Sequence, residues 1–347
     1  MSTAGEVTAR HRFDEARLQA HLATRLPGFA GPLEVRQFQG GQSNPTYLLA
    51  TPTQRYVMRS KPGPVAKLLP SAHAIEREFR VMSALASAGI PVPRMLLLEE
   101  DEAVIGRAFF VMAHVEGRIF WDPALPGLTP QARAEIYDEM NRVLAALHAV
   151  DPATIGLADY GKAGNYFARQ IGRWSKQYQA SETTPIEAMN RLIDWLPQHV
   201  PAGEETAIVH GDYRLDNLIF HPTEPRIVAV LDWELSTLGH PLADFSYHCM
   251  AWHIPPGAFR GIGGLDLAAL GIPSEADYIA RYCERSGRAA IGHWNFYLAY
   301  NLFRIAAILQ GVYKRATEGL ASSDNALQTG RNVQALADLG WRYAQRA

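Results

Sequence analysis

Short apolar runs with strand character dominate the first third of the chain. Residues 33–38, 46–50 and 55–60 predict three β-strands joined by short polar connections, because each run is rich in apolar or aromatic residues and ends at turn-forming residues. Residues 94–99 and 108–115 have the same character. We therefore expect a five-stranded, mostly antiparallel sheet in this part of the chain.

Helical periodicity occurs at two places in the first third of the chain and dominates the remaining two thirds. Residues 14–25 predict an opening helix, and residues 71–89 predict a helix inserted after the third strand, with apolar side chains three or four apart and a glycine stop. Similar periodicity predicts helices near 129–150, 162–180, 185–199, 240–253, 274–286, 292–317 and 324–345. The pattern predicts an α+β protein with an N-terminal lobe, residues 1–115, containing the small five-stranded antiparallel sheet and one helix, and a larger, mainly helical C-terminal lobe, residues 116–347.

A polar cluster interrupts the helical part of the chain. Three short β-rich runs, "AIVH", "LIF" and "IVAVL", surround it. Asp212 and Asn217 lie between the first two runs, and Asp232 follows the third. Because adjacent strands bring their loop ends together, Asn217 and Asp232 can converge on one cation while Asp212 faces the space beside it.

The residue types in this cluster suit phosphoryl transfer. Mg²⁺ prefers oxygen ligands and needs only one or two protein side chains when water and substrate phosphates supply the rest. The stretch "HGDYRLDN" has the H-x-D-x-x-x-x-N spacing of loops whose aspartate accepts the proton of an attacking hydroxyl, and "LDW" takes the place of D-F-G. This order predicts Asp212 as the catalytic base and Asn217 and Asp232 as magnesium ligands, with His210 as a hydrogen-bonding residue that holds the loop.

Composition narrows the range of partners and locations. The formal charge of −2 and the lack of a basic run argue against nucleic acid as a partner. Cys249 and Cys283 lack CxxC spacing, which favours buried thiols in a reducing compartment. Since no apolar run of 18 or more residues and no secretory signal are found, we expect a cytoplasmic protein that does not enter a membrane.

These motifs resemble those of the aminoglycoside phosphotransferase and choline kinase-like family. Its members have a protein-kinase-like two-lobed fold and a catalytic loop that begins with H-G-D. The resemblance covers nearly the whole chain and implies ATP and Mg²⁺ as cofactors. It implies the same roles for Asp212, Asn217 and Asp232, and it makes Asp244 in "GHPLADFSY" a buried brace that accepts hydrogen bonds from the catalytic loop.

The resemblance extends to phosphate-binding residues of the N-terminal lobe. The stretch "YVMR" matches the strand that in many members ends in a phosphate-binding lysine, and "IERE" matches the helix that supplies its glutamate partner. Here the basic residue is Arg59, with Glu78 as the expected partner. Lys61 points to the same strand face and remains an alternative.

Two other segments are assigned to the nucleotide by the same resemblance. The stretch "GGQSN" takes the place of the phosphate-covering loop, where Gly41 permits close approach and Ser43 offers a hydroxyl and an amide. The stretch "FVMAHVEG" takes the place of the hinge. There the backbone of Ala113 and Val115 would bind the adenine edge, and Met112 would line its pocket.

The phosphate acceptor is predicted from finer features. The stretches "GQSNPTYLL" and "LDWELSTLGHPLADF" look closest to kinase-like domains fused to, or encoded beside, acyl-CoA dehydrogenases, which implies a hydroxy acid or hydroxyacyl thioester as substrate and an acyl-CoA dehydrogenase as a partner. From 251 to 347 there are seven Asp and Glu against ten Lys and Arg, a poor surface for a polycation. An aminoglycoside- or choline-type kinase and a nucleotide-binding pseudokinase remain alternatives. Candidates to hold an acyl chain and its anionic head are Trp121, Trp233, Tyr247, Trp252 and Arg304.

Overall fold

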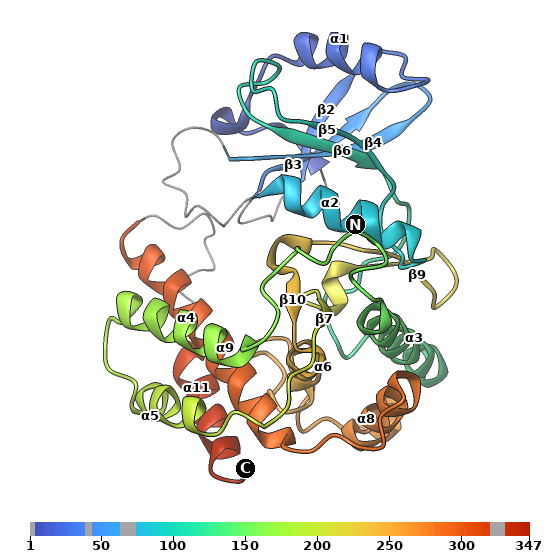
Figure 1. Ribbon diagram of the computed structural model, residues 1–347. Coiled ribbons are helices and arrows are strands. Elements are labelled where there is room, and N and C mark those ends of the chain that lie inside the picture. Colours follow the sequence, from blue (N-terminus) through green and yellow to red (C-terminus); the bar gives the residue numbers. More distant parts are fainter. Residues whose placement is uncertain (1–3, 39–43, 63–73, 320–329) are drawn as a thin grey trace. The chain divides into compact units, whose positions relative to one another are not determined.

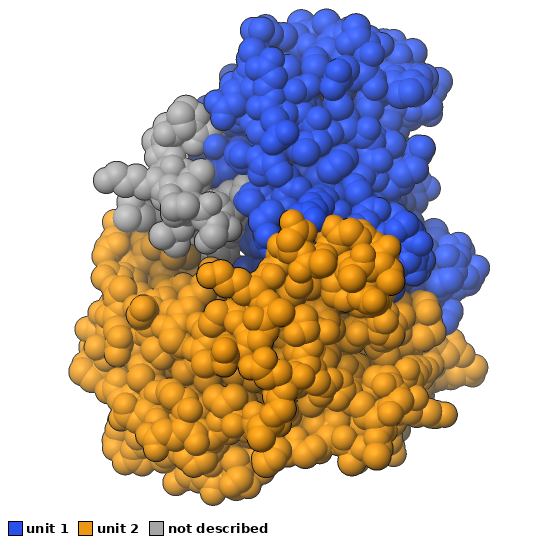
Figure 2. All heavy atoms as spheres, in the orientation of Figure 1, with its two compact units in different colours: residues 1–119, 217–235 blue, residues 120–216, 236–347 orange. Residues whose placement is uncertain are grey.

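The chain forms two compact units. The computed structural model describes residues 4–38, 44–62, 74–319 and 330–347. Figure 2 colours unit 1, residues 1–119 and 217–235, and unit 2, residues 120–216 and 236–347. Unit 1 therefore includes a segment that the sequence alone placed in the C-terminal lobe.

Unit 1 is built on an antiparallel sheet of six strands in the order β1-β2-β3-β4-β6-β5 (Figure 1). The expectation of five strands was wrong by one, because Ala4 and Gly5 pair with the end of β2 although two small residues carry no strand pattern. The bounds are β1 (Ala4–Gly5), β2 (Glu34–Phe38), β3 (Thr46–Ala50), β4 (Arg55–Ser60), β5 (Met95–Glu99), β6 (Phe109–Ala113), β8 (Leu218–Phe220), β9 (Ile227–Val230), α1 (Glu15–Arg25) and α2 (Ile75–Ser87).

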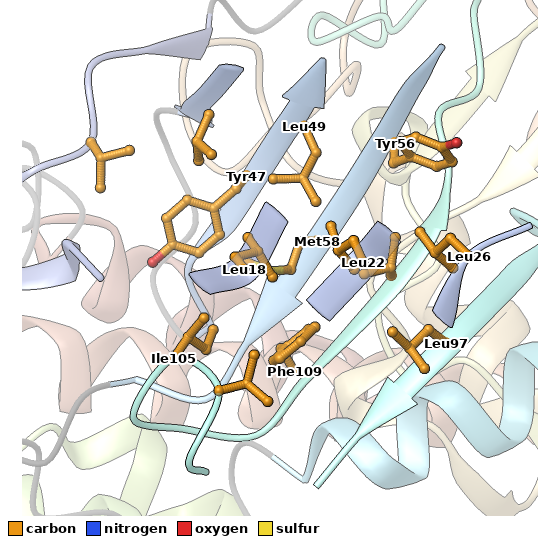
Figure 3. Packing of buried hydrophobic residues seen from close by; sticks show 14 residues of the cluster. Leu18, Leu22, Leu26, Tyr47, Leu49, Tyr56, Met58, Leu97, Ile105 and Phe109 are labelled. Carbon is orange, nitrogen blue, oxygen red and sulfur yellow. The ribbon is translucent and has the colours of Figure 1, made fainter. Parts of the chain in front are cut away.

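The two helices of unit 1 pack on the sheet. Leu18 and Leu22 of α1 join Met58 and Phe109 of the sheet in one buried cluster, which Figure 3 shows from close by. The ring of Phe110, the next residue of β6, lies 6.3 Å from a ring on α2. Because neighbouring side chains of a strand point to opposite faces, β6 is buried on both sides, which explains its unbroken apolar run.

The β8–β9 hairpin is fastened to the N-terminal part of unit 1. Arg118 and Phe220 exchange backbone hydrogen bonds, each 2.8 Å long, and the N–H of Val230 donates to the carbonyl oxygen of Pro91 at 2.8 Å. At Gly117 an added Cβ would lie 2.3 Å from the carbonyl oxygen of Phe220, so only glycine permits this approach. These contacts hold the hairpin as part of unit 1.

Unit 2 is mainly helical. Its longest helix, α9, is buried along most of its length, which fits a sequence that is apolar on nearly every side. Strand β7 pairs with β10, a partner that the sequence did not predict, and not with β8. Within the described residues no helix is long and apolar enough to cross a bilayer. The bounds are α3 (Pro130–Ala149), α4 (Tyr166–Ser181), α5 (Glu187–Trp195), β7 (Ala207–Val209), β10 (Thr237–Gly239), α6 (Pro241–Cys249), α7 (Leu267–Leu270), α8 (Glu275–Ser286), α9 (Trp294–Thr317) and α11 (Asn332–Ala344).

Candidate active site

Strand β7 leads directly into the loop formed by His210, Gly211 and Asp212, here called the HGD loop. Asp244, in the first turn of α6, accepts hydrogen bonds from the backbone N–H groups of His210 at 2.7 Å and Gly211 at 2.8 Å. Asp244 is only 2% exposed. A buried carboxylate that binds two consecutive N–H groups fixes the course of the loop, because leaving either donor unmet inside the protein would be costly.

A histidine from α3 completes the surroundings of Asp244. The Nε2 atom of His148 lies 3.2 Å from Asp244 Oδ2, and its Nδ1 atom lies 2.8 Å from the hydroxyl of Tyr282. Burial alone would raise the pKa of Asp244, but the hydrogen bond and charge of His148, with the further contribution of His210, lower it below its ordinary value. Asp244 therefore stays ionised while it holds the loop.

The centre of the HGD loop needs glycine. Gly211 has a φ of 82°, in the left-handed region that is costly for residues with a Cβ. Its carbonyl oxygen accepts a hydrogen bond of 2.6 Å from Nη2 of Arg304, whose guanidinium also lies 5.1 Å from the ring centre of Tyr247. Both backbone groups of Gly211 are thus bound by charged side chains, one from α6 and one from α9.

The carboxylate of Asp212 is held by two neighbours in unit 2. The hydroxyl of Tyr247 donates to Asp212 Oδ1, and Nε of Arg214 lies 3.1 Å from the same oxygen. Burial and the charge of Asp212 raise the pKa of Tyr247, so its hydroxyl keeps its proton and acts as a donor. Since both contacts are made to Oδ1, they orient the carboxylate group of Asp212.

Asn217 and Asp232 lie at the same end of the β8–β9 hairpin. Leu218 pairs with Val230, and the N–H of Leu231 donates to the carbonyl oxygen of Asn217 at 2.8 Å. Asp232 follows with a φ of 66°, a left-handed conformation that aspartate tolerates better than most residues. The register thus places the two residues at one end of the hairpin, and their amide and carboxylate groups are of the oxygen-donor type that Mg²⁺ prefers, with phosphate and water needed to complete the set.

Arg59 is the centre of an ion-pair cluster in unit 1. Its Nη1 atom lies 3.4 Å from Glu78, and its Nη2 atom lies 2.9 Å from Asp232 and 3.0 Å from Glu234. Burial would lower the pKa of Arg59, but the three carboxylates raise it, so the guanidinium stays charged. Burial raises the pKa of Glu78 to about 7 although Arg59 lies beside it, because the guanidinium is shared with two further carboxylates. The buried amide of Asn44 also donates to Glu78, at 3.1 Å.

The remaining nucleotide candidates are placed less completely. Lys61 pairs with Glu76 on α2, so the two basic residues have different partners. The N–H of Ala113 donates to the carbonyl oxygen of Arg94 at 2.9 Å, so this group is already used within the sheet. The predicted pocket residue Met112 is buried in β6. Two further predicted residues, Gly41 and Ser43, lie outside the described residues.

The five candidate acceptor residues fall into different surroundings. Trp121, Tyr247 and Trp252 line one pocket of unit 2. Trp233 belongs to unit 1, is 1% exposed, and donates from its indole nitrogen to the carbonyl oxygen of Val230. Arg304 is also buried, and it binds the HGD loop as described above. Residue type alone could not separate these positions, because an indole or guanidinium serves packing and ligand binding equally well.

Sequence reasoning missed three polar residues of the site. His148 lies far along the chain from the HGD loop, and no local pattern relates the two. Glu234 stands two positions after Asp232, and both carboxylates contact Arg59, so a second acidic residue this close in the sequence was a usable signal. Arg214, two positions after Asp212, contacts it directly.

Known proteins resemble this chain over most of its length. Residues 34–289 match the sequence profile of the phosphotransferase enzyme family. The chain is 51% identical over 318 residues to mouse acyl-CoA dehydrogenase family member 10, covering 91% of this chain and 30% of that protein. It is 42% identical over 351 residues to human acyl-CoA dehydrogenase family member 11, covering 99% of this chain and 45% of that protein. The chain therefore spans less than half the length of these curated relatives.

Solved structures give the same result for the fold. A crystal structure of a candidate aminoglycoside phosphotransferase from Ralstonia eutropha JMP134 is 61% identical, with a TM-score of 0.89 over 97% of this chain and 99% of that one. The aminoglycoside phosphotransferase APH(4)-Ia, in a ternary complex with AMP-PNP and hygromycin B, has a TM-score of 0.63 at 16% identity, over 95% of this chain and 99% of that one, a likeness of fold alone. The chain belongs to the phosphotransferase enzyme family and has its kinase-like fold.

Proposed function

We propose that the chain is a small-molecule kinase that moves the γ-phosphate of ATP to a substrate hydroxyl with the help of Mg²⁺. The observation that carries this proposal is the braced HGD loop followed in sequence by the oxygen donors of the β8–β9 hairpin. Asp244 accepts hydrogen bonds from the loop that leads to Asp212, and the hairpin register, with Asn217 and Asp232 at one end, supports their proposed role as a ligand pair. These are the parts that phosphoryl transfer requires of a protein.

Each residue then has a chemical role. Asp212 accepts the proton of the acceptor hydroxyl while the oxygen of that hydroxyl forms a bond to the γ-phosphorus of ATP. The bond between the γ-phosphorus and the bridging β-phosphate oxygen breaks, and ADP leaves. Asn217 and Asp232 would hold Mg²⁺, which neutralises charge on the phosphates. Arg59 would grip phosphate oxygens through its planar donor fork. The hinge residues around Met112 and the segment with Gly41 and Ser43 would bind the rest of the nucleotide.

Arg59 is expected to contribute more to nucleotide affinity than Lys61. Replacing Arg59 by alanine removes a charged donor worth about 1.5–3 kcal/mol, so AMP-PNP should bind about 10- to 150-fold more weakly. Replacing Arg59 by lysine should give an intermediate loss of AMP-PNP affinity. The ammonium keeps the charge, but it lacks the planar donor fork and cannot contact all three carboxylates that hold Arg59 in place. Calorimetry with Lys61→Ala as the matched comparison measures the difference. A larger loss in Lys61→Ala would transfer the phosphate-binding role to Lys61.

The acceptor is proposed to be a hydroxy acid or hydroxyacyl thioester. Two observations support this class: the relatives named as acyl-CoA dehydrogenase family members, and the excess of basic over acidic residues after position 250. Phosphorylation of such a substrate would turn its hydroxyl into a leaving group. An acyl-CoA dehydrogenase would then be a natural partner for the chain.

A panel of acceptors tests the proposed function. ATP consumption is measured with hydroxy acids, hydroxyacyl thioesters, kanamycin and choline, and the product is located by mass and phosphorus NMR. We expect turnover of hydroxy acids or their thioesters only. Turnover of kanamycin or choline in their place would make the chain an antibiotic- or choline-type kinase. Nucleotide binding without turnover of any acceptor would favour a pseudokinase that serves a dehydrogenase.

A further inference from the structure

Unit 2 contains a pocket whose walls are largely aromatic and apolar. The space open to a water-sized sphere is about 50 Å³, and the whole hollow, open solvent at the mouth included, is about 520 Å³. Tyr137 and Trp252 meet edge to face inside it, with ring centres 5.4 Å apart, and Met140 adds a flexible apolar surface. Trp121 stands at the exposed side, with 55% of its surface accessible. A surface of this kind suits an alkyl chain, since aromatic rings offer a large apolar area and the flexible thioether side chain adapts to the shape of a ligand.

Two arginines lie along the same pocket. Arg260 forms an ion pair with Asp216, and Arg214 bridges Asp216 at 3.5 Å and Asp212 at 3.1 Å. The side chain of Asp216 is 6% exposed, whereas those of Arg260 and Arg214 are 34% and 24% exposed. The carboxylate is thus the least exposed of the three charged groups that line this part of the pocket, and the two guanidinium groups are the more accessible ones.

Arg260 is held in place by its backbone. Its φ is 51°, in the left-handed region that is uncommon for residues other than glycine. At the next residue, Gly261, an added Cβ would lie 1.7 Å from the carbonyl oxygen of Ile254, and the N–H of Ile262 donates to the carbonyl oxygen of Ala251 at 2.8 Å. Such local strain persists where the surroundings fix it, and it is frequent in ligand-binding segments.

The electrostatics of Arg260 agree with this geometry. Burial, followed by the charge of Arg214, lowers the pKa of Arg260 to about 10 although the charge of Asp212 acts in the other direction, so the side chain is charged at neutral pH. An added anion would offset both effects. The guanidinium also lies 5.7 Å from the ring centre of Trp121, which keeps it beside the apolar wall.

We infer that this pocket is the acceptor site and that Arg260 selects amphipathic anionic hydroxy compounds. The alkyl chain lies on the wall formed by Tyr137, Met140 and Trp252, the acid group binds Arg260, and the hydroxyl points to Asp212. The pocket reaches that far because two of its lining residues, Tyr247 and Arg214, contact Asp212 directly. The inference rests on the proposed function for the role of Asp212, but the binding of chain and anion does not depend on it.

Binding of three probes that need no phosphate transfer tests the inference. Octanoate, octanol and octyltrimethylammonium share an alkyl chain and differ in charge. By calorimetry we expect octanoate to bind at least tenfold more tightly than octanol and the cation to bind most weakly. Shortening the acid should weaken binding by about fourfold for each CH₂ removed.

Variants separate the charge from the chain. Arg260→Gln should abolish the preference for octanoate over octanol, whereas Arg281→Gln, a surface arginine paired with Asp138, should leave it unchanged. Trp121→Ala, at an exposed position, should weaken all three probes. Equal binding of octanoate and octanol to the unaltered chain, or an undiminished preference in Arg260→Gln, would overturn the inference.

The outcomes also distinguish this inference from the proposed function. A chain that binds octanoate through Arg260 but transfers phosphate to no acceptor would refute the kinase and leave the pocket assignment standing. Turnover of hydroxy acids that Arg260→Gln leaves unchanged would confirm the kinase and refute the role of Arg260. The effect of Arg260→Gln on turnover is also compared between free hydroxy acids and their uncharged N-acetylcysteamine thioesters. An effect on the acids that is absent in the thioesters supports the inference, and an equal effect on both contradicts it.

Discussion

Replacing Asp212 by asparagine is expected to lower phosphoryl transfer by about 10²- to 10⁴-fold, because the variant has no group to accept the proton of the attacking hydroxyl. Nucleotide affinity should change little, since the proposed nucleotide-binding residues belong to unit 1 and Asp212 belongs to unit 2. The measurements are single-turnover rates with the best hydroxy acid of the acceptor panel and calorimetric titration of AMP-PNP.

The control for this prediction is Asp338→Asn, an exposed position on α11. It should retain the full rate. Because Tyr247 and Arg214 both contact Asp212, the thermal unfolding of Asp212→Asn has to be recorded as well. A folded Asp212→Asn variant with an unreduced rate would remove this residue from the chemistry.

Replacing Asp244 by alanine is expected to have the largest effect on stability. The change strands the two backbone N–H groups and the imidazole that the carboxylate binds, and the loss of one partner of such a buried group costs about 3–5 kcal/mol. Denaturation by urea measures the free energy of unfolding. The matched variant Asp338→Ala should change it by less than about 0.5 kcal/mol. Equal stability of the two variants would mean that Asp244 does not brace the loop.

The contacts of Asp244 should also make the free energy of unfolding depend on pH in acid. The folded-state pKa of Asp244 lies below its ordinary value of 3.8. Its contribution to stability is therefore complete above that ordinary value and is lost as the pH falls through the lower folded-state value. As the pH falls below about 3.8, the unaltered chain should lose more stability than Asp244→Asn, whose side chain does not titrate there. Parallel loss in both chains would contradict the assigned cause.

Local sequence predicted those parts of the fold that local patterns encode. Strands β3 and β4 begin and end where predicted, and the α+β class with a protein-kinase-like fold is confirmed. Pairings between distant segments were less accessible. Strand β10 pairs with β7 although the β8–β9 hairpin lies between them in the sequence, and the two-residue strand β1 is defined only by its pairing with β2. Neither has a periodicity of its own, so only the tertiary fold could identify them.

The candidate site follows the same rule. Asn217 and Asp232 could be paired from sequence, because a short hairpin places the residue before one strand beside the residues after the other. Arg59 and Glu78 could be paired through the motif that each resembles. His148 could not, since α3 reaches Asp244 only through the packing of unit 2. Arg260 could not be identified from the sequence either. Its proposed role in ligand binding depends on the ion pair with Asp216 and on the neighbouring ring of Trp121, which only the tertiary fold brings together.

The central claim is that Asn217 and Asp232 bind a cation only together with the phosphates of a nucleotide. The most direct measurement is calorimetric titration of AMP-PNP with and without Mg²⁺ for the unaltered chain, Asp232→Asn and Asp212→Asn. We predict that Mg²⁺ tightens AMP-PNP binding by at least about tenfold in the unaltered chain and in Asp212→Asn, and by little in Asp232→Asn. An equal gain from Mg²⁺ in Asp232→Asn would contradict the account.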